Sequence, residues 1–115
     1  MLVCRLGDMG KTGHLCTPMI PAKATQGSVF ANGIPVNRMG DPAFPHLIKF
    51  GKFCVGHGAM INQGSPTVFA EGIPIARVGD SFDFGAMVQG SPNVMAGGGS
   101  VGASPDAGVL SGGGL

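Results

Sequence analysis

A short phrase recurs along the chain and constrains the fold more than any other feature. Gln-Gly-Ser occurs three times, and each copy leads within two residues into Val-Phe-Ala or Val-Met-Ala. The copies span residues 26–31, 63–70 and 89–96. Arg-x-Gly-Asp also occurs three times, beginning at Arg5, Arg38 and Arg77. Such a repeat means that one small unit was copied. Three copies in 115 residues predict a single body with pseudo-threefold symmetry.

The segments around each copy have the pattern of short β-hairpins. Asn32-Gly33 and Glu71-Gly72 each separate two apolar runs, and Asn-Gly is a strong signal for a two-residue hairpin turn. Glycine and proline interrupt every window long enough for an amphipathic helix. We therefore expect an all-β fold, a small pseudo-threefold cone of short β-hairpins. Variable loops would meet at its tapered apical end, and they span roughly residues 9–25, 42–62 and 81–88.

Length and composition predict one small domain whose core is too small to stabilise it without a further link. We expect residues 1–97 to form the repeat body and residues 98–115, which are rich in glycine, to form a tail of linker-like composition. The chain has 22 glycines and neither tryptophan nor tyrosine, so its core is small and its backbone costly to order. A disulfide, a metal or a partner usually stabilises such a domain.

Charge, apolar segments and cysteine content limit the kinds of partner and cellular location that the sequence indicates. The formal net charge is +1 without a basic run, so nothing indicates nucleic acid. The N-terminus lacks the apolar core of a secretory signal, and no stretch reaches the length of a membrane span. Three cysteines cannot form a full disulfide framework and fit thiols kept reduced or used for metal.

A metal site is the chemistry that the variable loops favour. All three histidines lie in them, together with two of the cysteines: His14, His46, His57, Cys16 and Cys54. Three imidazoles and one thiolate would form a closed tetrahedral set that suits structural zinc. Cys54 is favoured as the thiolate because it stands three residues before His57, and Cys16 is the alternative. Cys4, on an apolar segment, is expected in the core.

A thiol enzyme is the alternative in which Cys54 would be a reactive nucleophile. The acidic residues other than Glu71 are aspartates at or near turn-like positions, Asp83 among them. The three that follow Gly in the repeat are expected to cap their own turns, with the repeated arginines beside them as scaffold. No Ser-His-Asp spacing, nucleophile elbow or phosphate loop is present. We therefore expect a protein that is not an enzyme.

The repeat resembles the hallmark phrase of the PAAR-repeat proteins. Residues 64–80 match it almost throughout, residues 27–41 match with a Pro-Thr pair missing, and residues 90–96 match its opening. Cys54-Val-Gly-His57-Gly is similar to the family's Cys-Pro-x-His-Gly. The resemblance implies a sharp cone with a metal, usually zinc, held near its tip by three histidines and one cysteine. Carried over, these ligands are His14, His46, Cys54 and His57.

The resemblance also implies a function. Such cones cap the trimeric β-helical spike, of valine-glycine-repeat or phage-tail type, in contractile injection machines: type VI secretion systems, phage tails and related particles. One tip chain would sit on each spike trimer and help to puncture the target envelope, touching its membrane transiently. The alternative is an adaptor that docks a separate toxin effector as cargo. Synthesis would be in the bacterial cytoplasm without a signal peptide. Candidates for an apolar base are Ile34, Val36, Ile73 and Ile75.

Overall fold

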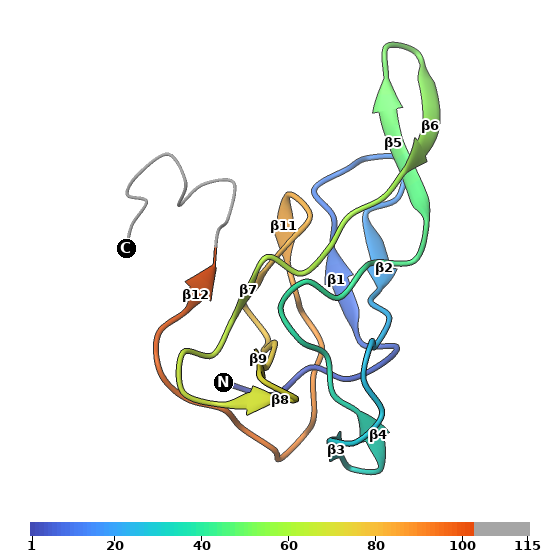
Figure 1. Ribbon diagram of the computed structural model, residues 1–115. Coiled ribbons are helices and arrows are strands. Elements are labelled where there is room, and N and C mark those ends of the chain that lie inside the picture. Colours follow the sequence, from blue (N-terminus) through green and yellow to red (C-terminus); the bar gives the residue numbers. More distant parts are fainter. Residues whose placement is uncertain (103–115) are drawn as a thin grey trace.

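The computed structural model describes residues 1–102, and within this range the regular structure consists of short strands without a helix. The expected all-β fold is thus confirmed (Figure 1). The strands are β1 (Met9–Lys11), β2 (Met19–Pro21), β3 (Phe30–Ala31), β4 (Ile34–Pro35), β5 (His46–Phe50), β6 (Phe53–His57), β7 (Gln63–Gly64), β8 (Phe69–Ala70), β9 (Ile73–Pro74), β10 (Ser81–Phe82), β11 (Gly85–Ala86) and β12 (Val101–Gly102).

The strands pair two by two, and every pair is antiparallel. Five pairs are hairpins of consecutive strands, and the sixth joins β7 to β12. The two expected turns are present: Asn32 and Gly33 have φ of 55° and 77°, and Glu71 and Gly72 have φ of 50° and 80°. Two successive positive φ values define the turn that matches the twist of a hairpin. Local turn chemistry therefore sets β3–β4 and β8–β9.

A ring of backbone hydrogen bonds marks the predicted pseudo-threefold axis. Cys4, Asn37 and Ala76 each stand immediately before a repeated arginine, and all three are fully buried. The Cys4 N–H donates to the Ala76 carbonyl at 2.9 Å, Ala76 donates to Asn37 at 3.0 Å, and Asn37 donates to Cys4 at 2.8 Å. Each unit therefore pairs with both others, and the ring closes. Because the ring closes, the buried N–H and carbonyl groups of all three segments have hydrogen-bond partners without a large sheet.

Two apolar clusters pack around the axis. One contains Cys4, Ala22, Ala43, Ile61, Ala76, Phe82 and Met87. The other contains Val3, Ala31, Val36, Ala70, Ile75 and Ala96. Val36 and Ile75 are therefore core residues and not members of an exposed base. Their backbones pair with axial segments of neighbouring units, Val36 with Arg5 and Ile75 with Arg38, which turns their side chains inward.

The repeated arginines are scaffold, as expected, but not in one uniform way. Arg77 and Asp80 form a fully buried pair, with Nη2 to Oδ1 at 2.9 Å and Nε to Oδ2 at 3.1 Å. Arg5 pairs with Asp8 in the same manner nearer the surface. In the remaining unit the Arg38 side chain instead donates to Thr25, at 2.8 Å from Nη2 to Oγ1.

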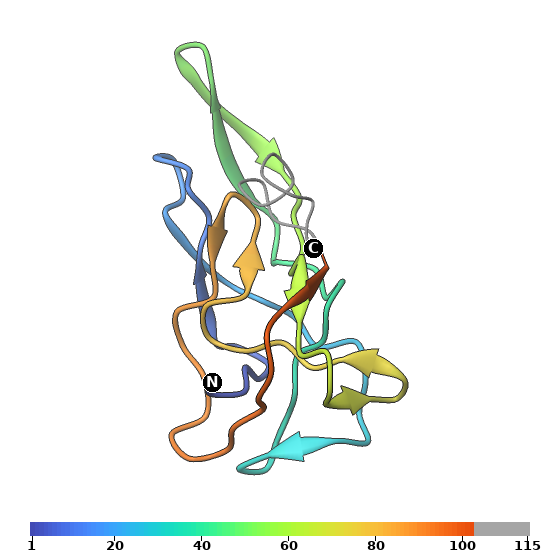
Figure 2. The same ribbon diagram turned by 90° about the vertical axis from the view of Figure 1, so that its left-hand side faces the viewer.

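The β5–β6 hairpin extends away from the body at one end, whereas β3–β4 and β8–β9 lie at the other (Figures 1 and 2). Residues 98–102, expected in the tail, lie against the body: Val101 pairs with Gly64, and the Ser100 hydroxyl donates to Asp80 at 3.1 Å. The rest of the expected tail, residues 103–115, lies outside the described residues. Among residues 1–102 no helix is long and apolar enough to span a membrane.

Candidate metal centre

Three histidines and one aspartate bring their side chains together near the β5–β6 end of the body. His14, His46, His57 and Asp83 offer donor atoms that all lie within 4.8 Å of one another. The Nε2 atoms of His14 and His46 are each 2.8 Å from Asp83 Oδ2, and His57 Nε2 is 3.3 Å from Oδ1. The variable loops thus converge, as the repeat predicted.

The long hairpin supplies two of the imidazoles. His46 begins β5 and His57 ends β6, and the strand register places them directly opposite each other. Directly paired residues point to the same face, which brings the two rings to a centroid distance of 5.0 Å. His46 Nδ1 lies 3.0 Å from the Phe44 carbonyl, which can only accept, so Nδ1 carries a proton. The other ring nitrogen, Nε2, lies 2.8 Å from Asp83 Oδ2, and because a carboxylate also only accepts, this contact needs either a proton or a cation between the two atoms.

The β1–β2 loop supplies the third imidazole. The His14 N–H donates to the Thr12 hydroxyl at 3.0 Å, and Gly13 adopts a φ of +82° that turns the chain toward the centre. The His14 side chain is almost wholly buried. Although its Nε2 lies close to Asp83, the contact lacks hydrogen-bond geometry, so this buried nitrogen has no hydrogen-bond partner among the described residues. Such an atom requires a partner of another kind.

Asp83 comes from the turn between β10 and β11. It has a φ of 55°, which aspartate tolerates better than most residues, and its carbonyl accepts from Asn62 Nδ2 at 3.1 Å. The hairpin approaches β1 very closely, because a Cβ on Gly85 would lie 2.1 Å from the Lys11 carbonyl oxygen. Glycine at this position is what lets the third loop reach the histidines.

The donor set fits a metal ion. The Nε2 atom of His46, a buried His14 nitrogen without a hydrogen-bond partner among the described residues and the Asp83 carboxylate lie close together, and a cation between them would compensate all three. The Nδ1–H of His46 bonded to a carbonyl is the outer contact typical of a ligating histidine. Imidazole and carboxylate together suit zinc and other divalent transition metals.

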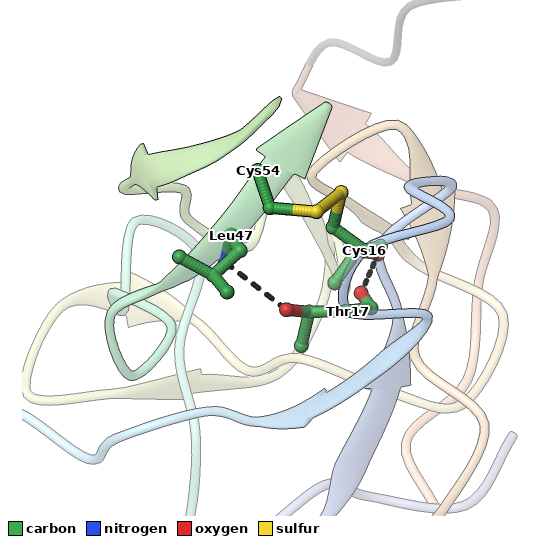
Figure 3. The surroundings of a disulfide bond; sticks show 5 residues. Cys16, Thr17, Leu47 and Cys54 are labelled. Atoms are coloured by element: carbon green, nitrogen blue, oxygen red, sulfur yellow. Dashed lines mark hydrogen bonds between the residues drawn. A yellow bond between two sulfur atoms is a disulfide. The ribbon is translucent and has the colours of Figure 1, made fainter. Parts of the chain in front are cut away.

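Cys54 does not join this cluster, which differs from our expectation. Its sulfur forms a disulfide with Cys16, across a Cα–Cα distance of 5.9 Å (Figure 3). Cys54 and His57 lie in the same strand, β6, at an odd spacing. Side chains alternate between the two faces of a strand, so these two point to opposite faces. The Cys-x-x-His spacing that would serve a metal in a turn therefore separates the residues here.

The two remaining cysteine expectations have different outcomes. Cys16, the alternative thiolate, is the other half of the disulfide, and the neighbouring Thr17 hydroxyl accepts from the Leu47 N–H at 3.0 Å (Figure 3). The β1–β2 loop is thus tied to β5–β6 twice. Cys4 is a buried core thiol, as expected, and its Sγ donates to the Gln89 carbonyl at 3.2 Å. Burial, with Asp8 and Asp80 adding to it, raises the pKa of the Cys4 thiol.

Asp83 is the member of the cluster that the sequence analysis missed. It resembled the repeated turn aspartates and was grouped with them. One signal could have identified it: the third variable loop has neither histidine nor cysteine, and Asp83 is its one residue with a metal-binding side chain of the kinds considered. If three equivalent loops meet on one axis, the third loop also contributes to the centre.

Comparison with known proteins agrees with this architecture. The family model described as PAAR motif matches residues 54–106, which include β6 from Cys54 onward, the Arg77–Asp80 pair and the Asp83 turn. No curated protein matches the chain. The PAAR motif is associated with spike-tip proteins of contractile injection systems. Together with the further repeat copy at residues 27–41 and the closed hydrogen-bond ring, this match supports a PAAR-repeat protein.

Proposed function

We propose that this chain is a non-enzymatic piercing tip that caps the trimeric β-helical spike of a contractile injection machine, one chain per spike trimer. The observation that carries the proposal is the closed ring of Cys4, Asn37 and Ala76, because it gives one chain three nearly equivalent sides. A chain with this symmetry makes similar contacts with all three subunits of a threefold partner.

The end opposite the metal centre has the apolar character that such a contact needs. Phe30 in β3, Phe69 in β8 and Met95 occupy equivalent places in the three units, after Val29, Val68 and Val94. Their exposed fractions are 53, 51 and 70%, respectively. Large apolar side chains repeated about an axis on one face mark a binding surface rather than scattered exposure. We call Phe30, Phe69 and Met95 the base residues.

The second part of the proposal concerns a structural metal ion that stabilises the end of the molecule opposite the base residues. His14, His46, His57 and Asp83 would hold one structural zinc ion, with the Asp83 carboxylate in place of the thiolate found in other family members. Four protein donors would fill a tetrahedral shell and leave no open position for a reaction. Because the donors come from all three variable loops, binding energy at this site is folding energy for the whole apical end.

A binding measurement with purified trimeric spike tests the capping function. The double variant Phe30→Asp/Phe69→Asp places charges on the base, and we expect binding to weaken at least a hundredfold, since two anchor residues are each worth about 2 kcal/mol. The matched control is Phe50→Asp/Phe53→Asp, which makes the same change at the opposite end of the molecule and should leave binding unchanged. Full affinity of the base variant would contradict the proposal.

A further inference from the structure

The β5–β6 hairpin is larger than the repeat requires. Its strands have five residues each, whereas the other described hairpins have strands of two or three. Only its first pair, His46 and His57, serves the metal centre, and the remainder extends beyond the body (Figures 1 and 2). Residues that neither fill the core nor hold the metal need another explanation.

One face of the extension is apolar along its whole length. The register pairs Ile48 with Val55 and Phe50 with Phe53, and these residues lie two and four positions from the histidine pair on the same face. Phe50 and Phe53, beside the turn, are 74 and 72% exposed. These are among the most exposed large apolar side chains of the described residues. Exposed phenylalanine beside a hairpin turn is costly in water and favourable in an apolar medium.

The charge of the hairpin indicates which kind of apolar medium it would contact. Lys49 and Lys52 flank Phe50, and the sequence has no aspartate or glutamate from residue 42 to residue 70. The extension therefore presents two positive charges with aromatic rings between and beside them. Lysine keeps its ammonium group in the polar layer while its stem lies along apolar surface. Aromatic rings beside basic residues are typical of segments that lie at the interface of an anionic bilayer.

The hairpin has the reach and the support for such a contact. Five strand residues rise about 17 Å, at roughly 3.4 Å per residue. This length is enough to reach the boundary between headgroups and acyl chains. It is too short to cross the hydrocarbon core, which is about 30 Å thick. On the opposite face, the disulfide from Cys54 to Cys16 ties the hairpin to the β1–β2 loop. The hairpin is thereby held pointing away from the body.

We propose that the β5–β6 hairpin is an anchor for an anionic membrane surface, in which Phe50 and Phe53 enter the acyl boundary and Lys49 and Lys52 contact lipid phosphates. This inference deepens the proposed function and rests on it, because a piercing tip meets a membrane with its leading end. It assigns the first contact to side chains of the extension rather than to the metal centre. Leu15, 85% exposed beside His14, lies at the same end and adds apolar surface.

Vesicle partitioning of the full chain tests the anchor. The probes are vesicles of equal parts phosphatidylglycerol and phosphatidylcholine, compared with vesicles of phosphatidylcholine alone. We expect the wild type to cosediment with the anionic vesicles and much less with the neutral ones. Phe50→Ser/Phe53→Ser should weaken partitioning on the order of a hundredfold, and Lys49→Gln/Lys52→Gln about thirtyfold. The matched control Phe30→Ser/Phe69→Ser, at the base, should partition like the wild type.

Depth of insertion gives a second measurement that does not require loss of binding. The chain has no tryptophan, so Phe50→Trp introduces a single indole. Its emission should shift to the blue in anionic vesicles and be quenched by brominated acyl chains, whereas the indole of Phe30→Trp should show neither effect. Absence of wild-type partitioning, equal partitioning of the serine hairpin variant, or insertion of the base indole instead would each overturn the anchor.

The spike measurement separates this inference from the function on which it rests. Phe50→Ser/Phe53→Ser should bind the trimeric spike with unchanged affinity, because β3 and β8, which contain Phe30 and Phe69, lie at the other end of the molecule (Figure 1). A chain that binds the spike but not vesicles retains its capping function and loses the anchor. A chain that binds anionic vesicles through the hairpin but never binds the spike retains the anchor, and the capping function is then wrong.

Discussion

At the scale of single residues, Asp83 decides the character of the candidate metal centre. One carboxylate faces three imidazole nitrogens, and its side chain is almost wholly buried. A buried carboxylate facing three imidazole nitrogens is balanced by a metal cation or by protons on the rings, whereas a thiolate from Cys54 would need the disulfide to be open. The fourth metal ligand, beside the three histidines, is therefore either Asp83 or Cys54, and variants of both residues can distinguish them.

Metal content of paired variants answers this question. We expect Asp83→Ala to lower zinc affinity more than about a hundredfold, because it removes a first ligand rather than a supporting contact. Cys16→Ser/Cys54→Ser should keep one zinc per chain. Elemental analysis, with chelator competition to rank affinities, gives both results. Loss of zinc in the serine variant together with retention in Asp83→Ala would reverse the assignment in favour of Cys54.

The Cys4 thiol gives a second test at this scale. It is fully buried, and burial raises its pKa, so the reactive thiolate is scarce at neutral pH. We expect iodoacetamide to leave the native protein unlabelled. After reduction it should label Cys16 and Cys54, and it should reach Cys4 only after denaturation. Mass spectrometry of digests distinguishes the three sites, and fast labelling of Cys4 in the native state would contradict its place in the core.

At the scale of elements, the apical end depends on links between loops of different units. The disulfide and the Thr17–Leu47 hydrogen bond tie the β1–β2 loop to β5–β6, and Asn62 ties the segment after β6 to the Asp83 turn. None of these elements could hold its position alone, because a two-stranded hairpin is marginally stable in water. Cross-links between them supply what the small core does not.

Removal of the disulfide measures this contribution. The bond joins positions 38 residues apart, and closing a loop of that size corresponds to about 4 kcal/mol in the chain-entropy account. We expect the zinc-loaded variant Cys16→Ser/Cys54→Ser to unfold at lower denaturant concentration than the oxidised wild type. Treating the wild type with reductant should lower its midpoint to that of the variant. An identical midpoint for oxidised and reduced wild type would show that the disulfide does not stabilise the fold.

At the scale of the whole molecule, three units share one axis and depend on one another. The hydrogen-bond ring closes through Cys4, Asn37 and Ala76, and the Arg77–Asp80 pair is buried beside it. Arg77 also donates to the carbonyls of Gly97 and Gly64, at 3.0 and 3.2 Å. It thus joins the third unit to the segment that ends the described body. We therefore expect the loss of one such residue to destabilise all three units together.

The buried pair should therefore be worth far more than its exposed equivalent. We expect Arg77→Met to lower the free energy of unfolding by about 3–5 kcal/mol, because Asp80 is left buried without its partner. Arg5→Met, at the partly exposed pair with Asp8, should cost on the order of 1 kcal/mol. Denaturant unfolding of both variants gives the comparison. Equal losses would mean that burial does not set the strength of the repeated pair.

Much of the architecture was predictable because it is encoded locally or by repetition. Asn32-Gly33 and Glu71-Gly72 supply the backbone conformations that their turns need, whatever surrounds them. The repeat of Arg-x-Gly-Asp implied three equivalent units, and equivalent units place their variable loops at one end. The gathering of His14, His46 and His57 follows from that symmetry, although His46 and His57 lie in strands rather than in loops.

Only the tertiary structure decided on which face of its strand each side chain lies and which side chains meet in space. The register of β5 and β6 placed His57 on one face and Cys54 on the other, and the close approach at Gly85 brought Asp83 to the histidines. Contacts between units likewise turned Val36 and Ile75 into the core and left Phe30 and Phe69 exposed. The repeat determines how many units there are and how each turns. Strand pairing between distant segments determines the facing of side chains, because a shift of one residue reverses every side chain in a strand.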